Sequence, residues 1–227
     1  MLQYDPLQSL PTAEDLPDSD DQPVDNELQI HVASLLGEIL AWYWGNRTNW
    51  FWGINMGVYY EVQKPAIAPD GFLSLGVERR THTSGRLSYV IWQERIVPIL
   101  AVEFVSKNYG QEYEDKKDVY ARIGVLYYVV YNPDYHQRNK HQPFEVYRLV
   151  DGEYILQSGE PVWIPEIGLG IGREQGTYLA WTREWLYWYD QNGNRLLSSD
   201  ERIQQQRQRA ERLAERLRQM GIDPDTL

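Results

Sequence analysis

The sequence predicts a domain of the α/β (α+β) class, with one central mixed β-sheet flanked by helices and an amphipathic helix at the C-terminus. Apolar residues first recur at helical spacing, from Leu28 to Tyr43. Several runs rich in Val, Ile, Tyr and Phe follow, separated by Gly and Pro, which is typical of strands. With 227 residues, the chain is long enough to bury one substantial core.

Composition limits the kinds of site that the protein can hold. The chain contains no cysteine, so disulfides and thiolate metal sites are excluded, and the four histidines show no ligand spacing. Carboxylates are therefore the leading candidates for metal ligands. No stretch approaches the roughly 20 apolar residues of a membrane span, and the acidic N-terminus does not resemble a secretory signal. We therefore expect a cytoplasmic protein with no membrane contact.

The negative charge is concentrated at the N-terminus. The net charge is −11, and residues 1–28 carry eight acidic side chains and no basic one. We divide the chain into an acidic, Pro-containing arm (residues 1–25), a folded domain (26–195) and a C-terminal helix (196–227). The arm has too few apolar residues to order itself independently. The folded domain is nearly neutral and shows no basic stripe, which weighs against a strong non-specific DNA binder.

The predicted elements follow one another along the domain. A helix begins after Asp25 or Asn26, either of which can cap it, and ends near Gly45. A polar run over residues 109–122 predicts a second helix, which Gly124 ends before a buried strand. Strands are predicted at residues 58–62, 67–75, 87–96, 99–105, 125–131, 144–149, 154–157 and 178–181, with loops at 83–85 and 165–176.

The C-terminal stretch from about residue 199 changes to Arg, Gln, Glu, Ala and Leu. A heptad frame over only about three repeats makes it marginal as a free coiled coil, so it needs the body or a partner subunit to pack on. We expect a homodimer formed through this helix. The two core positions of the frame hold Leu196, Ile203, Ala210 and Leu217, and Gln206, Leu213 and Met220.

Two acidic residues are candidates for a site. Glu103 lies inside the apolar run 99–105, and burying an unpaired charge costs several kcal/mol, so it needs a cation, a hydrogen-bond network or a metal. An arginine or lysine at the sheet edge would satisfy it without any function. Asp70 follows Pro69, where an aspartate is commonly just a turn residue.

The order of several short motifs adds to this. Over about residues 28–182 the chain resembles the Uma-two family of restriction-endonuclease-like proteins, formerly a domain of unknown function. The tail at 217–225, Leu-Arg-Gln-Met-Gly-Ile-Asp-Pro-Asp, is similar to the ending common in that family. The matching motifs are Pro69-Asp70, the Ala-Val-Glu-Phe-Val-Ser run around Glu103, Lys116 with Tyr120, Gly124-Val125 and Tyr128.

The resemblance implies a PD-(D/E)XK nuclease site with a restriction-endonuclease-like core. Asp70 and Glu103 would be the catalytic acids and, with the carbonyl of Phe104, the ligands of Mg²⁺ or Mn²⁺. Such hard cations prefer oxygen ligands and retain waters. The implied activity is hydrolysis of phosphodiester bonds in DNA.

The lysine of this motif is displaced. Strand side chains alternate, so a lysine at position 105 would point into the site, but the chain has Val105 there. Lys107 shares that face near the strand end, whereas Lys116 matches the family's own helix-borne lysine and is our preferred candidate. Lys116 would otherwise be a solvated lysine in a charged run, and its neighbour Lys117 is a weaker candidate. Glu38, on the first helix, is a further possible acid.

Two functions therefore compete. The first is a Mg²⁺-dependent endodeoxyribonuclease, a hydrolase. The second is a catalytically weak or inactive nuclease-fold protein that acts as a binding or regulatory module, which Val105 and the acidic charge favour.

Overall fold

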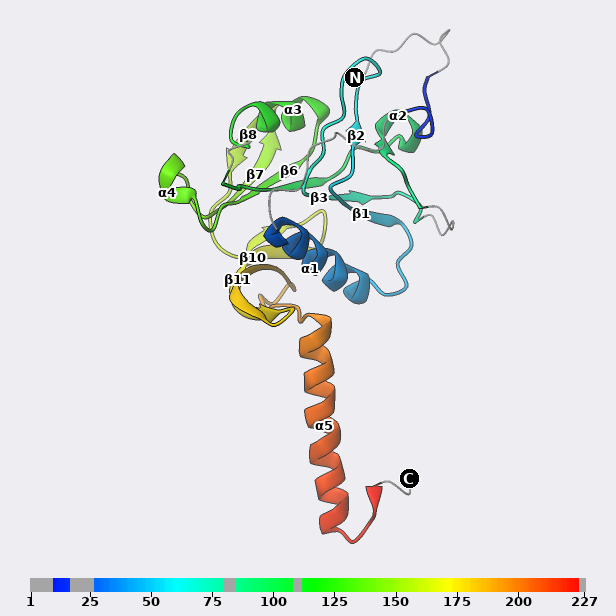
Figure 1. Cartoon of the computed structure of the whole chain (residues 1–227), viewed down its shortest axis with the longest axis vertical. Coiled ribbons are helices and arrows are strands. Elements are labelled where there is room, and N and C mark those ends of the chain that lie inside the picture. Colours follow the sequence, from blue (N-terminus) through cyan, green and yellow to red (C-terminus); the bar gives the residue numbers. More distant parts are fainter. Residues whose placement is uncertain (1–9, 17–26, 80–84, 108–111, 225–227) are drawn as a thin grey trace.

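The computed structural model describes residues 10–16, 27–79, 85–107 and 112–224 (Figure 1). The helices are α1 (Glu27–Tyr43), α2 (Ile91–Glu94), α3 (Asp115–Ile123), α4 (His136–Asn139) and α5 (Ser199–Gln219). The strands are β1 (Trp50–Ile54), β2 (Val58–Tyr59), β3 (Gly71–Leu75), β4 (Tyr89–Val90), β5 (Leu100–Phe104), β6 (Tyr127–Tyr131), β7 (Phe144–Val150), β8 (Glu153–Leu156), β9 (Val162–Ile164), β10 (Leu169–Tyr178) and β11 (Trp181–Tyr189).

The central sheet has six strands in the order β1-β3-β5-β6-β7-β8. Strands β5 and β6 are parallel, and the other neighbours in this sheet are antiparallel, which confirms the predicted mixed sheet. Parallel neighbours need a crossover connection, and α3 provides it between β5 and β6. This crossover carries α3 across the sheet beside β5.

The sheet separates two cores. On one face, α1 and the strands β9 to β11 pack against the sheet around Leu36, Val102 and Trp188. The indole of Trp188 donates to the carbonyl of Leu36 at 3.1 Å, which ties β11 to α1. On the other face, α3 covers a smaller core that contains Tyr120 and Val130. Because strand side chains alternate, Glu103 faces the α3 side, between Ala101 and Val105 of that smaller core.

Strands β9, β10 and β11 form a second, antiparallel sheet, so the prediction of a single sheet is wrong. The loop predicted at 165–176 is mostly β10, and the strand predicted at 178–181 is the turn between β10 and β11, where Leu179 and Ala180 have φ of 49° and 60°. The glycines in β10 accommodate a close neighbour: a Cβ on Gly172 would lie 3.0 Å from the Cα of Pro161. Glycine here permits close packing within a strand rather than marking a loop.

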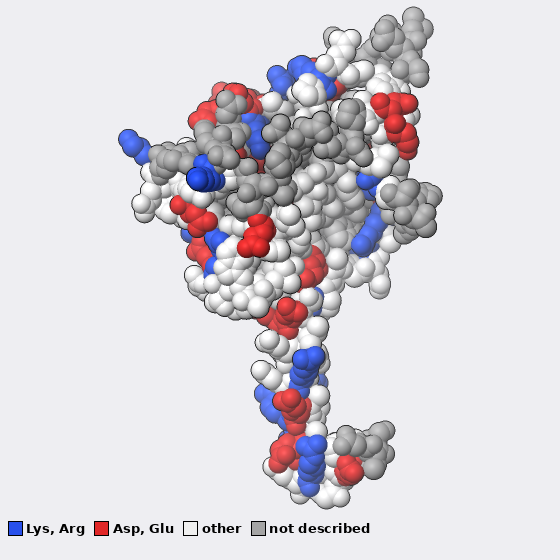
Figure 2. All heavy atoms as spheres, viewed as in Figure 1, with Lys and Arg blue, Asp and Glu red and all other residues white. Residues whose placement is uncertain are grey.

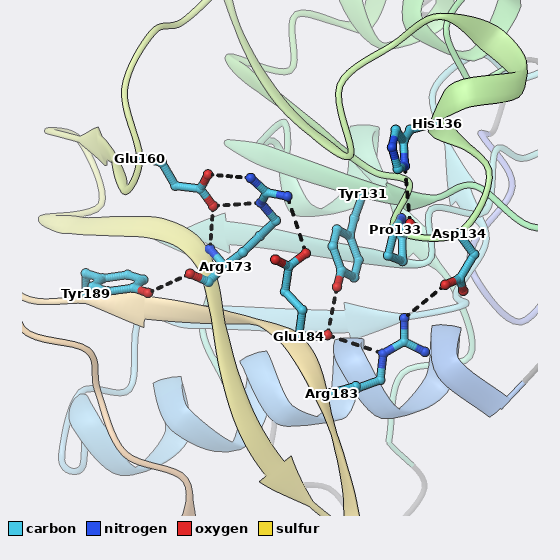
Figure 3. Close-up of polar contacts among 9 residues, drawn as sticks. All are labelled: Tyr131, Pro133, Asp134, His136, Glu160, Arg173, Arg183, Glu184 and Tyr189. Atoms are coloured by element: carbon cyan, nitrogen blue, oxygen red, sulfur yellow. Dashed lines mark hydrogen bonds and ion pairs between the residues drawn. The ribbon is translucent and has the colours of Figure 1, made fainter.

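Polar contacts join the second sheet to the central one (Figure 3). The Tyr131 hydroxyl of β6 donates to the Glu184 carbonyl of β11 at 2.9 Å. Arg183 of β11 pairs with Asp134, which follows β6, at 3.5 Å. Together with the apolar packing against α1, these bonds attach the second sheet to the face opposite α3.

Local predictions on the first half of the domain had mixed outcomes. The first helix is confirmed as α1, and Gly124 does end α3, with a φ of 91° that favours glycine. The strand predicted at 87–96 is wrong in its second part, because residues after Val90 form the short helix α2. Strand β1, between tryptophan-rich segments, was not predicted. The loop tip predicted at 83–85 lies largely outside the described residues.

The described part of the N-terminal arm, residues 10–16, packs on the body. The amide of Ala13 donates to the side chain of Gln93 at 3.1 Å, and Trp92 donates to the carbonyl of Pro11 at 2.9 Å. These contacts fix residues 11–13 against α2. Among the described helices, no helix is both long and apolar enough to cross a membrane.

Helix α5 projects away from the body (Figure 1), and none of its residues is buried. Its first turn is held by a capping box, in which Ser198 accepts from the Glu201 amide and the Glu201 side chain accepts from the Ser198 amide. Apolar side chains remain exposed along it, including Ile203, Leu213 and Met220. Contact of this helix with the body is confined to its first turn, where Arg202 lies 4.3 Å from the ring centre of Trp42, so the expected packing along the body is not formed by the described residues.

The packing of α1 on β1 yields a first prediction. A Cβ on Gly37 would lie 2.5 Å from the ring of Trp52, which is held by its bond to the Ala33 carbonyl. Gly37→Ala gains at most about 1 kcal/mol of helix propensity, whereas forcing the ring aside costs roughly 1–3 kcal/mol. We therefore expect net destabilisation in urea unfolding. The control Ser34→Ala, on the same helix, should change the unfolding free energy by less than about 0.5 kcal/mol; equal effects would contradict the steric argument.

Candidate functional site

Asp70 and Glu103 lie side by side on the α3 face of the central sheet. In the pairing of β3 with β5, Gly71 lies opposite Val102, so the preceding residue, Asp70, falls opposite Glu103. Opposed side chains on one face of an antiparallel pair have Cβ atoms about 5 Å apart. The side chain of Asp70 is 8% exposed and that of Glu103 is fully buried. Two carboxylates therefore share one buried position.

Glu103 receives two hydrogen bonds from α3. The ammonium of Lys116 donates to Oε2 at 2.8 Å, and the hydroxyl of Tyr120 donates to Oε1 at 2.6 Å. Lys116 and Tyr120 are four residues apart, so they lie on the same face of the helix. Both oxygens of the buried carboxylate thus have a donor, as its burial requires.

Asp70 is held by the backbone of β5. Its Oδ2 accepts the amide of Phe104 at 2.7 Å. The ladder between β3 and β5 ends at Gly71, so the Asp70 side chain supplies a partner to this amide beyond the last paired residues. This bond fixes the carboxylate beside Glu103.

The charges of the pair are only partly balanced. Burial, and then the negative charge of Glu103, raise the pKa of Asp70 well above its usual value, against the amide of Phe104 and the charge of Lys116. Burial alone would lower the pKa of Lys116, but the adjacent Glu103 outweighs it and raises that pKa above its ordinary value. Lys116 is therefore a cation at neutral pH. One ammonium group faces two carboxylates.

Lys116 is the lysine that contacts the acids, as the resemblance implied. Its side chain is 31% exposed, so it joins the buried pair to the surface. Val105 is buried in the core under α3, where a lysine would have to replace an apolar contact. Lys107 is exposed beyond the end of β5. The ammonium of Lys117 lies 3.5 Å from the ring centre of Tyr147, on β7.

Glu38 has a different place. Its Oε1 accepts the amide of Ser199 at 2.6 Å, at the first residue of α5. Helix α1 packs on the face of the sheet opposite α3, so Glu38 is not brought to Asp70 and Glu103. A carboxylate at a helix N-terminus is stabilised by the exposed amides there, which explains its position.

The donor set fits a hard divalent cation. Asp70 and Glu103 offer carboxylate oxygens, and the pair carries more negative charge than Lys116 balances. Among the described residues, no cluster of three or more His, Cys, Asp or Glu side chains occurs. Mg²⁺ commonly binds through one or two carboxylates and takes its remaining ligands from water and phosphate. The geometry of the pair is compatible with that mode.

Tyr120 is a site residue that the sequence reasoning did not name as one. Its hydroxyl donates to Glu103, and burial raises its pKa well above the usual value, so it remains a neutral donor. The Lys-x-x-x-Tyr spacing was a sufficient signal, because any residue four positions after Lys116 shares its helix face. The turn before α3 is also fixed to the sheet, because the hydroxyl of Tyr128 on β6 donates to the carbonyl of Glu112 at 2.6 Å.

A mixed sheet with a buried acid pair and a lysine on the crossover helix defines an α/β protein with a carboxylate site. A family model described as "Putative restriction endonuclease" (Uma2, the Uma-two family named above) matches residues 21–180. The chain belongs to this family, which confirms the resemblance.

Two further comparisons complete this. The chain is similar to a solved structure described as a putative nuclease from Anabaena variabilis ATCC 29413, with 12% identity and a TM-score of 0.44, over 63% of this chain and 74% of that one. A comparison with curated proteins finds no match.

The raised pKa of Asp70 predicts a pH-dependent stability. An acid that binds its proton more tightly in the folded state destabilises the fold increasingly as pH rises from its unfolded pKa towards its folded pKa. Asp70→Asn removes that cost and keeps an acceptor for the Phe104 amide. In metal-free buffer, we expect it to stabilise the protein by about 1–3 kcal/mol at pH 8 and by much less at pH 4.

Urea unfolding at the two pH values measures this difference. Asp151→Asn is a matched control, because Asp151 is exposed in a turn with a φ of 50°, which asparagine tolerates. Equal stabilisation of Asp70→Asn at both pH values, or destabilisation at pH 8, would show that the charged form of Asp70 is not disfavoured by the fold.

Proposed function

We propose that the protein is a metal-dependent endonuclease that hydrolyses phosphodiester bonds in DNA. The observation that carries the proposal is the buried pair Asp70 and Glu103 with Lys116 bonded to Glu103 at 2.8 Å. Membership of the family described as "Putative restriction endonuclease" supports the same reaction class. Asp70 lies immediately before β3, Glu103 lies in β5 and Lys116 in α3, and the crossover by α3 brings Lys116 to the acids.

Asp70, Glu103 and the carbonyl of Phe104 would hold Mg²⁺ or Mn²⁺. When bound, such an ion supplies positive charge for the phosphoryl oxygens and lowers the pKa of a coordinated water. The bond from the Phe104 amide to Asp70 orients one ligand, and Tyr120 orients the other. The Phe104 amide and the Tyr120 hydroxyl thus hold the two carboxylate ligands in place without touching the substrate.

Lys116 acts as a cation in this scheme. Its raised pKa excludes a role as a general base at neutral pH, because it holds its proton. A partly exposed ammonium group beside the acids can donate to a phosphate oxygen or to the attacking water, and stabilise the negative charge that develops there. This is the role that we assign to it.

Charge limits the mode of DNA binding. The net charge is −11, and acidic and basic side chains are interspersed on the face shown in Figure 2. Binding by a broad basic surface is therefore disfavoured, and affinity must come from local contacts around the site and from the metal. We expect weak binding with a marked dependence on salt.

Metal binding is the first test of the proposal. Isothermal calorimetry with Mg²⁺ or Mn²⁺ should give one class of site in the wild type, and Asp70→Ala or Glu103→Gln should abolish it. The variant Asp151→Asn should bind as the wild type does. No heat of binding at millimolar ion, with a folded protein, would overturn the enzymatic proposal.

Cleavage is the second test. On plasmid and on single-stranded DNA with Mg²⁺ or Mn²⁺, Asp70→Ala should lose all cutting, and Lys116→Gln should cut roughly 10²-fold more slowly or worse. Lys64→Gln, which removes a surface lysine paired with Glu61, should cut normally. Retained cutting by Asp70→Ala would mean a contaminant or a different site.

A binding or regulatory module is the second candidate function. Both oxygens of Glu103 already accept bonds from Lys116 and Tyr120, so the pair is also stable as a purely structural cluster with Asp70 protonated. Under this alternative the protein binds no metal at the pair, and the calorimetry decides between the two.

We also propose that the protein is a homodimer through α5. This helix extends from the body with Ile203, Leu213 and Met220 exposed at 48%, 54% and 67% on one apolar stripe. A stripe of this kind is stabilised by a second copy of the same helix. Arginine and glutamate residues beside it can pair between two helices.

Light scattering tests this arrangement. Removing residues 199–227, or introducing Leu213→Glu in the stripe, should convert a dimer to a monomer. Gln208→Glu, off the stripe, adds the same charge and should leave the mass unchanged. A monomeric wild type, or a truncated protein that remains dimeric, would refute the role of α5.

A further inference from the structure

A second buried carboxylate lies on the same face of the central sheet as the acid pair. Val130 of β6 is opposite Glu103 of β5 on one side and opposite Glu145 of β7 on the other. Residues opposed in this way point to one face. Asp70, Glu103, Val130 and Glu145 thus form one row across four strands, and Glu145 is 5% exposed. The proposed nuclease function does not use this residue.

Glu145 is fully engaged by nearby donors. Its Oε1 accepts the amide of Gln142 at 2.9 Å and lies 3.2 Å from Nδ1 of His141. Its Oε2 accepts the hydroxyl of Tyr147, also on β7. The carboxylate therefore holds the imidazole of His141 in one orientation, with Nδ1 towards Glu145.

The ring of His141 is also fixed from the side. It stacks on the ring of Tyr113, with centroids 3.5 Å apart and planes inclined by 2°. The hydroxyl of Tyr113 accepts the side-chain amide of Asn132 at 3.1 Å, and Asn132 is fully buried. Within the part of the chain that the structure describes, Nε2 of His141 has no hydrogen-bond partner, and the side chain is 33% exposed. The imidazole is thus held by Glu145 and Tyr113 and remains partly exposed.

This arrangement is joined to the acid site through α3. Tyr113 lies three residues before Lys116, in the turn that leads into the helix, and Lys117 lies over the ring of Tyr147. The basic side chains of Lys116, Lys117 and His141 therefore border one face on which Asp70, Glu103 and Glu145 are the buried acids. Tyr113 and Tyr147 also contact His141 and Glu145, and Glu112 and Glu114 are further acids that act on Tyr113.

We propose that His141 binds a phosphate of the nucleic-acid strand on one side of the scissile bond, as a subsite of the proposed nuclease function on which this inference rests. Two strand spacings separate Glu103 from Glu145, or roughly 10 Å. That distance is too great for His141 to touch the reacting atoms. It is compatible with a phosphate one to three nucleotides away, because one strand carries a charge about every 3.4 Å along a duplex axis.

The chemistry of His141 favours this ligand. When both ring nitrogens of an imidazole carry a proton, Nδ1–H can donate to the carboxylate of Glu145 while Nε2–H donates to a ligand. Phosphate oxygens accept such charge-assisted bonds well. The fixed ring loses little conformational freedom when the ligand binds. The contact should contribute to binding of the strand more than to the rate of its cleavage.

Salt dependence of oligonucleotide binding tests the proposal. Binding of a labelled single-stranded oligonucleotide is followed by fluorescence anisotropy at pH 6.0 in EDTA, where no cutting occurs, over a range of salt concentrations. Each phosphate contact to a single strand contributes about −0.7 to the slope of log K against log salt. His141→Gln should reduce the slope by about 0.7, and His141→Arg should retain it.

His31→Gln is the matched control. His31 is also paired with a glutamate, Glu27, at 3.9 Å, but on α1, on the opposite face of the sheet. This variant should bind as the wild type does. Thermal unfolding of each variant confirms that it is folded, and an unchanged slope in a folded His141→Gln protein overturns the proposal.

The outcomes separate this inference from the nuclease proposal. Metal binding and cutting with an unchanged slope in His141→Gln would leave the nuclease proposal standing without the subsite. A reduced slope without metal binding would establish a nucleic-acid subsite and reject the nuclease. A wild type that binds no oligonucleotide overturns the subsite, whatever the calorimetry shows.

Discussion

The burial of Glu103 is the constraint on which the rest of the site depends. A buried carboxylate in β5 with no partner would lower the stability of the fold by several kcal/mol. This is more than the helix or strand propensity of a single residue contributes. Lys116 and Tyr120 remove that cost, and both come from α3. The helix must therefore end where it does, at Gly124, and return directly into β6.

The site is not arranged for greatest stability. Asp70 adds a second carboxylate to a buried position that holds one ammonium group, and its raised pKa is the result. A hydrophobic residue at either position would pack there without that cost. Perturbed acids of this kind cluster at functional sites, where binding of a ligand offsets the cost. Glu145 differs from Asp70 in this respect. Donors within the fold satisfy the Glu145 carboxylate, whereas the charge of Asp70 remains unbalanced.

Much of this could be predicted from single residues, and the rest depended on pairing. The central strands, α1 and the stop at Gly124 follow from periodicity and from glycine, and Glu103 was recognisable as a charge in an apolar run. Strand β10 was missed because its glycines suggested a loop, whereas they admit Pro161 from the neighbouring segment. Glu145 stands between buried Phe144 and Val146 just as Glu103 stands between Val102 and Phe104, yet only the register of β6 shows that both face one side.

The cap that Glu38 provides to α5 has a geometric consequence. Because this bond ties the first turn of α5 to α1, the helix leaves the body in a fixed direction, and its 21 residues extend about 30 Å. Two such helices paired in parallel would hold both bodies side by side at the same end of the pair. Joined antiparallel, they would keep the bodies at opposite ends of a rod, too far apart to act on neighbouring phosphates of one duplex. If the proposed nuclease is also the proposed dimer, the relative direction of the two helices would decide whether one assembly breaks one strand or two.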